Sequence, residues 1–112
     1  MVELLREDIP PGTLHLLILK TLARGSNHGY GIAQLIQTMS RDVFQLEEGS
    51  LYPALQRMLL KGWLKAEWQQ TENNRRARVY SLSALGRKQL ETELDKYRRV
   101  SQAIGRVITA LS

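Results

Sequence analysis

The chain has 112 residues, the length of one domain or of one domain with an extension. Its 16 Lys and Arg residues exceed its 11 Asp and Glu residues, and the net charge of +5 favours an anionic partner such as nucleic acid. The absence of cysteine excludes a disulfide scaffold, a thiolate metal site and a cysteine nucleophile.

The N-terminal residues 1–11 are predicted to form a short arm, because the double proline Pro10-Pro11 stops a helix. Leu4 and Leu5 of this arm could dock on a neighbouring element. The acidic, mixed start does not resemble a signal peptide, and the longest apolar run is about half the length that a membrane span needs. We therefore expect a cytoplasmic protein with no membrane partner.

Three helices are predicted in the first half of the chain by apolar residues at helical spacing. The first begins at Gly12 and ends at Gly25, and its wide apolar face places it at the centre of the domain. The second follows residues 26–28, and the third begins near residues 48–50 and ends at Gly62. The expected core positions include Leu14, Leu17, Ile18, Leu22, Ile32, Leu35, Ile36, Met39, Leu51, Leu55, Met58 and Leu59.

Strands are predicted in two places. Residues 43–46 form a short β-like run before the third helix. Residues 63–69 alternate as a strand should, residues 71–74 have turn composition, and residues 75–82 form the return strand. The second region is therefore a β-hairpin.

The last predicted element is a long helix for which Ser83 is the N-cap. Seven of its residues are spaced alternately four and three apart, which is the seam through which a long helix packs on another helix. A helix of about 29 residues spans roughly 44 Å, more than a domain of this size covers. The seam, which predicts a partner, consists of Leu90, Leu94, Tyr97, Ser101, Ile104, Ile108 and Leu111.

The predicted fold is mainly α with a small β-hairpin, in the order helix, helix, short strand, helix, hairpin, long helix. This order is that of a winged helix-turn-helix, in which the second and third helices form the turn unit and the hairpin is the wing. We expect residues 1–82 to form this domain, with the arm at residues 1–11, and residues 83–112 to form a C-terminal dimerisation helix.

The outward face of the third helix and the return strand of the wing carry side chains that suit a DNA duplex. Gln56 and Arg57 can reach base edges in the major groove, and hydroxyl groups can donate to phosphate. Clustered arginines on a wing can lie along phosphates or in a minor groove. Each segment alone could be a solvated polar face, but together with the basic charge they favour DNA. The predicted contacts are Ser50, Tyr52, Pro53, Gln56 and Arg57 on the helix, and Asn74, Arg75, Arg76 and Arg78 on the wing.

Two further pairs of residues have more than one interpretation. His28 and Tyr30 open the second helix and could touch the DNA backbone, although a core or capping role is equally open. Trp63 and Trp68 are five residues apart on one predicted strand, so they face opposite ways. We expect one of them in the core and the other at the dimer junction or beside a ligand cavity.

The alternative function is a protein-interaction module that uses a winged helix without binding DNA. Tyr52 and Arg57 would then meet a protein surface, and the wing arginines would only raise solubility. An enzyme is not expected, because the chain has no glycine-rich phosphate loop and no nucleophile beside a base. His15 and His28 do not form a metal-binding pair at the usual spacing, and no cofactor is expected.

Five segments together resemble one known family. They are residues 28–32 (HGYGI), 48–55 (EGSLYPAL), 62–64 (GWL), 72–80 (ENNRRARVY) and 85–86 (LG). Each segment alone would be a weak signal, but the combination is similar to the PadR family of bacterial transcriptional regulators over about residues 12–94.

The resemblance implies a cytoplasmic winged-helix homodimer that usually represses transcription, with the third helix in the major groove and the wing near the minor groove. Some small members bind aromatic drugs between tryptophans of the last helix, where this chain has Tyr97 and no Trp. We expect a pseudo-palindromic operator and an unidentified small-molecule effector that would bind between the long helices and release the DNA. The resemblance implies pairing through the C-terminal helices, with Leu90, Leu94, Tyr97, Ile104, Ile108 and Leu111 at the dimer contact.

Overall fold

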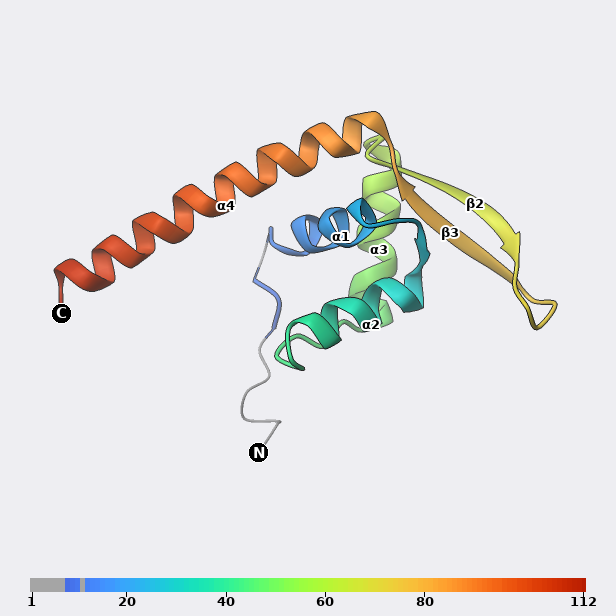
Figure 1. The fold of residues 1–112 in the computed structure, drawn as a ribbon, viewed down its shortest axis with the longest axis horizontal. Coiled ribbons are helices and arrows are strands. Elements are labelled where there is room, and N and C mark those ends of the chain that lie inside the picture. The colour runs from blue at the N-terminus through green and yellow to red at the C-terminus, as the bar shows by residue number, and fades with distance from the viewer. Residues whose placement is uncertain (1–7, 11) are drawn as a thin grey trace.

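The computed structural model describes residues 8–10 and 12–112 and shows a winged helix followed by a long helix (Figure 1). The predicted fold class is therefore confirmed, whereas Leu4, Leu5 and most of the predicted arm lie outside the described residues. Within the described part of the chain, no helix has the length and apolar character needed to cross a membrane. The elements are α1 (Leu14–Ala23), β1 (Asn27–His28), α2 (Gly29–Met39), α3 (Glu48–Leu60), β2 (Leu64–Gln70), β3 (Arg76–Leu82) and α4 (Ala84–Ala110).

The core is built around α1, as the wide apolar face of that helix predicts. This helix contacts α2, α3, α4 and β3, and its residues Ile18 and Leu19 are completely buried. Helical spacing brings apolar side chains of α2 and α3 to the same centre. The buried side chains are Leu16, Ile18, Leu19, Leu22, Ile32, Ile36, Leu51, Ala54, Leu55, Met58, Leu64, Tyr80 and Leu90.

The wing belongs to an antiparallel sheet with the strand order β1-β3-β2. The sequence predicts the β2–β3 hairpin but not β1, in which Asn27 pairs with Tyr80 and His28 with Val79. A strand of two residues has no alternation of apolar and polar positions to reveal it. The pairing matters because β1 fixes the start of α2 against the base of the wing.

The β-like run predicted for residues 43–46 is wrong. Apart from an isolated bridge at Phe44, this segment is a loop that joins α2 to α3. The Ser40 hydroxyl accepts a hydrogen bond from the backbone N–H of Phe44 at 3.0 Å, and Arg41 and Asp42 adopt left-handed conformations with φ of 54° and 64°. The loop packs Phe44 and Leu46 against the core, and such buried apolar residues resemble the composition of a strand.

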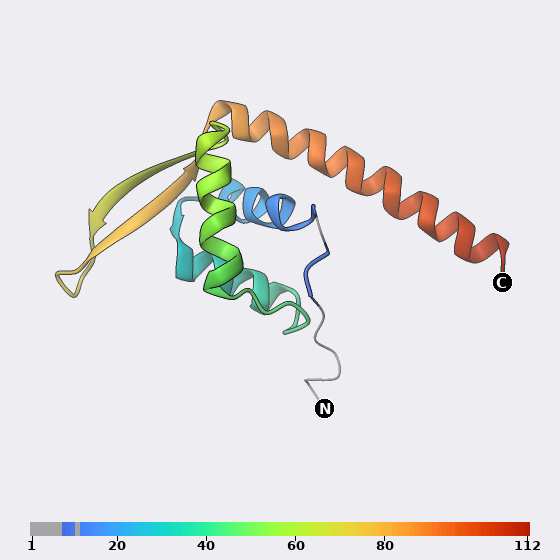
Figure 2. The same ribbon diagram turned by 180° about the vertical axis from the view of Figure 1, so that it is seen from behind.

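The helix α4 begins at the base of the wing and extends well beyond the domain. The Ser83 hydroxyl accepts from the N–H of Gly86 at 3.0 Å and donates to the carbonyl of Gly62 at 2.6 Å, which confirms the predicted cap. All residues from Asp95 to Ser112 are exposed. Figures 1 and 2 show that this half of α4 and the wing point away from the domain in opposite directions.

Candidate nucleic-acid interface

The outward face of α3 is open to solvent. Its inner face is buried through Leu51, Ala54, Leu55 and Met58, and Figure 2 shows α3 at the front of the domain with no other element covering it. A single helix of this kind fits the major groove of B-DNA. The five predicted contacts on this helix are all exposed: Ser50, Tyr52, Pro53, Gln56 and Arg57.

A hollow of about 740 Å³, which we call the wing basin, lies between the inner face of the wing and the first turns of α2 and α3. It brings together predicted contacts from α2, α3 and the wing, although they are far apart in the sequence. No acidic side chain lines it, so its electrostatic potential favours an anion. The lining residues are His28, Gly29, Tyr30, Tyr52, Trp68, Thr71, Asn73, Arg75, Arg76, Ala77, Arg78 and Tyr80.

Two arginines of β3 lie over aromatic rings in this basin. The guanidinium of Arg76 is 5.1 Å from the ring centroid of Trp68, and that of Arg78 is 5.8 Å from the ring centroid of Tyr80. Burial raises the pKa of the Tyr80 hydroxyl, and the positive charge of Arg78 partly opposes this rise. Neither arginine forms an ion pair with a described residue, so both charges are available to a ligand.

Asn74 shapes the tip of the wing. Its φ of 61° is a left-handed conformation that asparagine tolerates well in turns, and its side-chain oxygen accepts a hydrogen bond from the amide of Gln70. The N–H of Arg75 donates to the Thr71 hydroxyl at 3.3 Å. Asn74 and Arg75 therefore sit in an ordered turn, and their contact with DNA remains a prediction.

His28 is the N-cap of α2, one of the roles that the sequence leaves open. Its Nδ1 accepts a hydrogen bond from the N–H of Gly31 at 3.1 Å. In this arrangement a neutral imidazole carries its proton on Nε2, which can donate to a ligand. The ring stacks parallel to Tyr30, with the centroids 6.3 Å apart. Capping is therefore compatible with a contact to a phosphate at the edge of the wing basin.

Tyr52 connects α3 to the start of α2. A Cβ atom on Gly29 would lie only 2.8 Å from the Tyr52 hydroxyl oxygen, so the Tyr52 ring would have to shift if this position carried a side chain. The Tyr52 side chain is 44% exposed and also lines the wing basin. The Tyr52 ring thus packs on the start of α2 while part of the side chain remains accessible.

Arg57 lies on the other side of α3 from the wing basin. With Ser50 and Pro53 it lines a separate hollow of about 490 Å³. Burial lowers the pKa of His15, and the charges of Arg57 and Lys61 lower this pKa further. Asp8 and Glu47 also line the hollow beside Arg57, so its lining is mixed in charge rather than uniformly positive.

The two tryptophans occupy different environments. Trp63 packs against the core and meets His15 edge to face at 5.6 Å. Trp68 is 58% exposed and lines the wing basin, away from α4. Sequence reasoning did not include Trp68 among the DNA contacts. No signal in the sequence alone marks Trp68, because the register that places it directly opposite Arg78 is known only from the structure.

The structure divides the predicted dimer contacts of α4 into two groups. Leu90 and Leu94 pack against the hydrophobic core of the domain. The remaining four contacts are exposed, and Val100 and Val107, which the sequence reasoning missed, extend the same face. The exposed fractions of these six side chains lie between 49% and 82%. We call this group the tail stripe; it consists of Tyr97, Val100, Ile104, Val107, Ile108 and Leu111.

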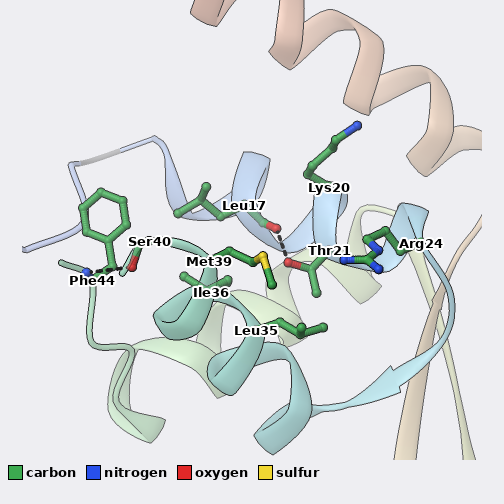
Figure 3. Close-up of a pocket in the computed structure, with 9 residues that line it drawn as sticks. All are labelled: Leu17, Lys20, Thr21, Arg24, Leu35, Ile36, Met39, Ser40 and Phe44. Atoms are coloured by element: carbon green, nitrogen blue, oxygen red, sulfur yellow. Dashed lines mark hydrogen bonds between the residues drawn. The ribbon is translucent and has the colours of Figure 1, made fainter. Parts of the chain in front are cut away.

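An uncovered apolar cavity of about 270 Å³ lies between α1 and α2. Figure 3 shows Leu35 and Met39 of α2 below Leu17 of α1, with Phe44 at one end. Met39 is 66% exposed. A neighbouring hollow between α1 and α4 shares Leu17 and Phe44 with the cavity and reaches Tyr97 of the tail stripe. An open apolar surface therefore continues along α1 to α4.

Within residues 8–10 and 12–112, no group of three His, Cys, Asp or Glu side chains is placed to hold a metal ion. The arrangement of the interface is instead that of an exposed helix beside a basic wing. Such a surface can bind a polyanion through arginines and hydroxyl donors and can read bases through the helix.

Comparison with known proteins identifies the family. Residues 18–92 match the sequence model described as the transcriptional regulator PadR-like family. A curated protein from Lysinibacillus sphaericus, named only as uncharacterized protein X, is 27% identical over 101 residues, which is 90% of this chain and 93% of that protein.

Solved structures show the same fold. A PadR family transcription regulator from Clostridium difficile is 29% identical, with a TM-score of 0.75 over 87% of this chain and 99% of that chain. A transcriptional regulator from Clostridium thermocellum is 23% identical, with a TM-score of 0.78 over 85% of this chain and 92% of that chain. Because the family model covers more than half of the sequence, the chain belongs to the PadR-like family of transcriptional regulators.

Proposed function

We propose that this regulator binds double-stranded DNA as a homodimer and represses transcription from a pseudo-palindromic operator. The observation that carries the proposal is the wing basin, where arginines without ion-pair partners face the first turns of α2 and α3 and no carboxylate intervenes. A phosphate backbone in this position would be neutralised by the wing while α3 lies in the adjacent major groove.

Each part of the interface has its own task in this proposal. Gln56 and Arg57 read base edges from the exposed face of α3, and Ser50 donates to phosphate. Arg76 and Arg78 neutralise the backbone or enter the minor groove. His28 and Tyr30 contact the backbone from the N-terminus of α2, while Tyr52, Pro53, Asn74 and Arg75 border these contacts.

We propose that α4 joins two copies of the chain, so that residues 1–82 are the DNA-binding unit and residues 83–112 the dimerisation helix. The tail stripe supports this proposal because a monomer would leave six large apolar side chains in water on a helix beyond its own domain. The apolar surface along α1, including the cavity in Figure 3, offers the partner's tail a place to pack. Leu90 and Leu94 would support the seam from within each subunit.

Two copies explain how a small interface reaches useful affinity. Each subunit neutralises few phosphates, and pairing two subunits doubles the salt-dependent contribution to binding. The two α3 helices would read half-sites about 34 Å apart. An effector seated beside Tyr97 between two α4 helices would change this spacing and release the DNA in the cytoplasm.

Selection of bound fragments from a random duplex library tests the proposal. We expect the recovered sequences to share an inverted repeat with half-site centres about 10 base pairs apart. Recovery of unrelated sequences would contradict operator recognition. Recovery of single half-sites without symmetry would contradict binding by a dimer.

A further inference from the structure

Trp68 is a large aromatic residue that takes no part in the hydrophobic core. It lies in the middle of β2 and is 58% exposed, although tryptophan is usually well buried on average. Its ring faces the wing basin rather than the hydrophobic core. The contact that the structure gives it is with Arg76 of the neighbouring strand.

The hairpin register explains how these side chains meet. Gln70 lies opposite Arg76 and Trp68 lies opposite Arg78, so Arg76 is the diagonal cross-strand neighbour of Trp68 on the same face. A diagonal neighbour is within reach of an aromatic ring, and the guanidinium of Arg76 lies 5.1 Å from the ring centroid. A planar guanidinium stacked on a ring still has its N–H edges free to donate.

We propose that Trp68 is a positioning residue that holds Arg76 over the wing basin, ready to contact a DNA phosphate; this inference rests on the proposed function. A free arginine loses rotamer freedom when it binds, and that loss weakens binding. Contact with the Trp68 ring restricts the guanidinium before the duplex arrives. Arg78 lies over the buried ring of Tyr80 in the same way, so both wing arginines are oriented by aromatic neighbours.

The test measures binding of a labelled random-sequence duplex at low ionic strength by fluorescence anisotropy. Trp68→Leu keeps an apolar side chain but removes the aromatic face, and we expect about threefold weaker binding per wing and about tenfold for two wings. Trp68→Tyr keeps an aromatic face and should bind within about twofold of the wild type. Trp68→Leu should add no further loss when Arg76 is already replaced in Arg76→Gln.

The outcomes separate this inference from the proposed function. If the wild type binds and Arg76→Gln weakens binding, but Trp68→Leu binds like the wild type, the positioning role is overturned and the function stands. Equal losses from Trp68→Leu with and without Arg76→Gln also overturn it, because Trp68 would then act independently of Arg76. If the wild type binds no duplex, both proposals fail.

A second measurement separates positioning from stability. Trp63→Phe leaves Trp68 as the single tryptophan, and we expect the duplex to reduce quenching of its fluorescence by iodide. The thermal unfolding midpoint of Trp68→Leu should stay close to that of the wild type, since the side chain is exposed. An unchanged quenching curve, or a large fall in the midpoint, would overturn the inference.

Discussion

At the scale of single residues, the packing of Gly86 limits what α4 can tolerate. A Cβ atom there would overlap the backbone carbonyl oxygen of Trp63, whereas one at Gly105 would meet nothing within 4 Å. We expect Gly86→Ala to lower the free energy of unfolding by about 1–3 kcal/mol. The control Gly105→Ala should raise it by up to about 1 kcal/mol. Chemical denaturation at equal protein concentration measures the free energy of unfolding of both variants. Equal changes in this free energy for the two variants would contradict the close packing at Gly86.

The partly buried His15 makes the stability depend on pH. Burial, together with the charges of Arg57 and Lys61, lowers its pKa from the ordinary 6.5, so protonation favours the unfolded chain. The stabilising contribution is present above pH 6.5 and is lost as the pH falls from 6.5 towards the lowered pKa of the folded state. We expect His15→Gln to flatten this part of the plot of thermal unfolding midpoint against pH. A curve for His15→Gln that falls as steeply as that of the wild type would contradict this role of His15.

Gln56 is the residue on which the proposed base preference depends most. Its side chain is exposed on the outward face of α3, where an amide can pair with adenine at a gain of about 1–3 kcal/mol over the wrong base. We expect Gln56→Ala to weaken binding to the selected operator more than binding to random duplex. Ser50→Ala, a predicted phosphate contact, should weaken both alike. Equal losses for Gln56→Ala would show that this residue reads no base.

At the scale of elements, the tail stripe of α4 should hold the proposed dimer together. Ile108→Asp would bury a charge in the apolar contact, and we expect sedimentation to show monomers. Gln102→Asp introduces the same charge on the opposite side of the helix, because successive residues turn by about 100°. This control should remain dimeric. A dimeric Ile108→Asp variant would contradict the role of the stripe.

The elements with strong periodic patterns could be predicted from the sequence. The spacing of apolar residues located the four helices, and Ser83 was recognised as a cap because serine accepts from the next turn. The strand β1 could not be predicted, because two residues show no alternation and are recognised as a strand only by their pairing with β3. The loop at residues 43–46 was mistaken for a strand because burial of Phe44 and Leu46 against the core imitates a strand's composition.

The sequence predicts many of the residues of the candidate site but not their arrangement in space. Alternation along β3 puts Arg76, Arg78 and Tyr80 on one face, but it does not show that this face turns towards α2. The position of Trp68 depends on the register between the two strands, which sequence alone does not give. Periodicity along α4 likewise could not show that Leu90 and Leu94 lie within the domain while the tail stripe lies beyond it.

At the scale of the whole molecule, the wing and the tail of α4 extend in opposite directions from one core (Figures 1 and 2). This shape separates the two proposed contacts, so that pairing through α4 leaves both wings and both α3 helices free. Net positive charge raises the rate and strength of encounter with a polyanion. The central claim is therefore that the wing arginines neutralise DNA phosphates.

The salt dependence of DNA binding tests this claim most directly. We expect the wild type to bind duplex DNA at low ionic strength, with log affinity falling by about 0.9 per phosphate contact for each unit of log salt concentration. The double variant Arg76→Ala with Arg78→Ala should reduce the slope by about two units for each bound wing, whereas Lys65→Ala on the outer face should leave it unchanged. An unchanged slope in the double variant, or no binding by the wild type, would contradict the account.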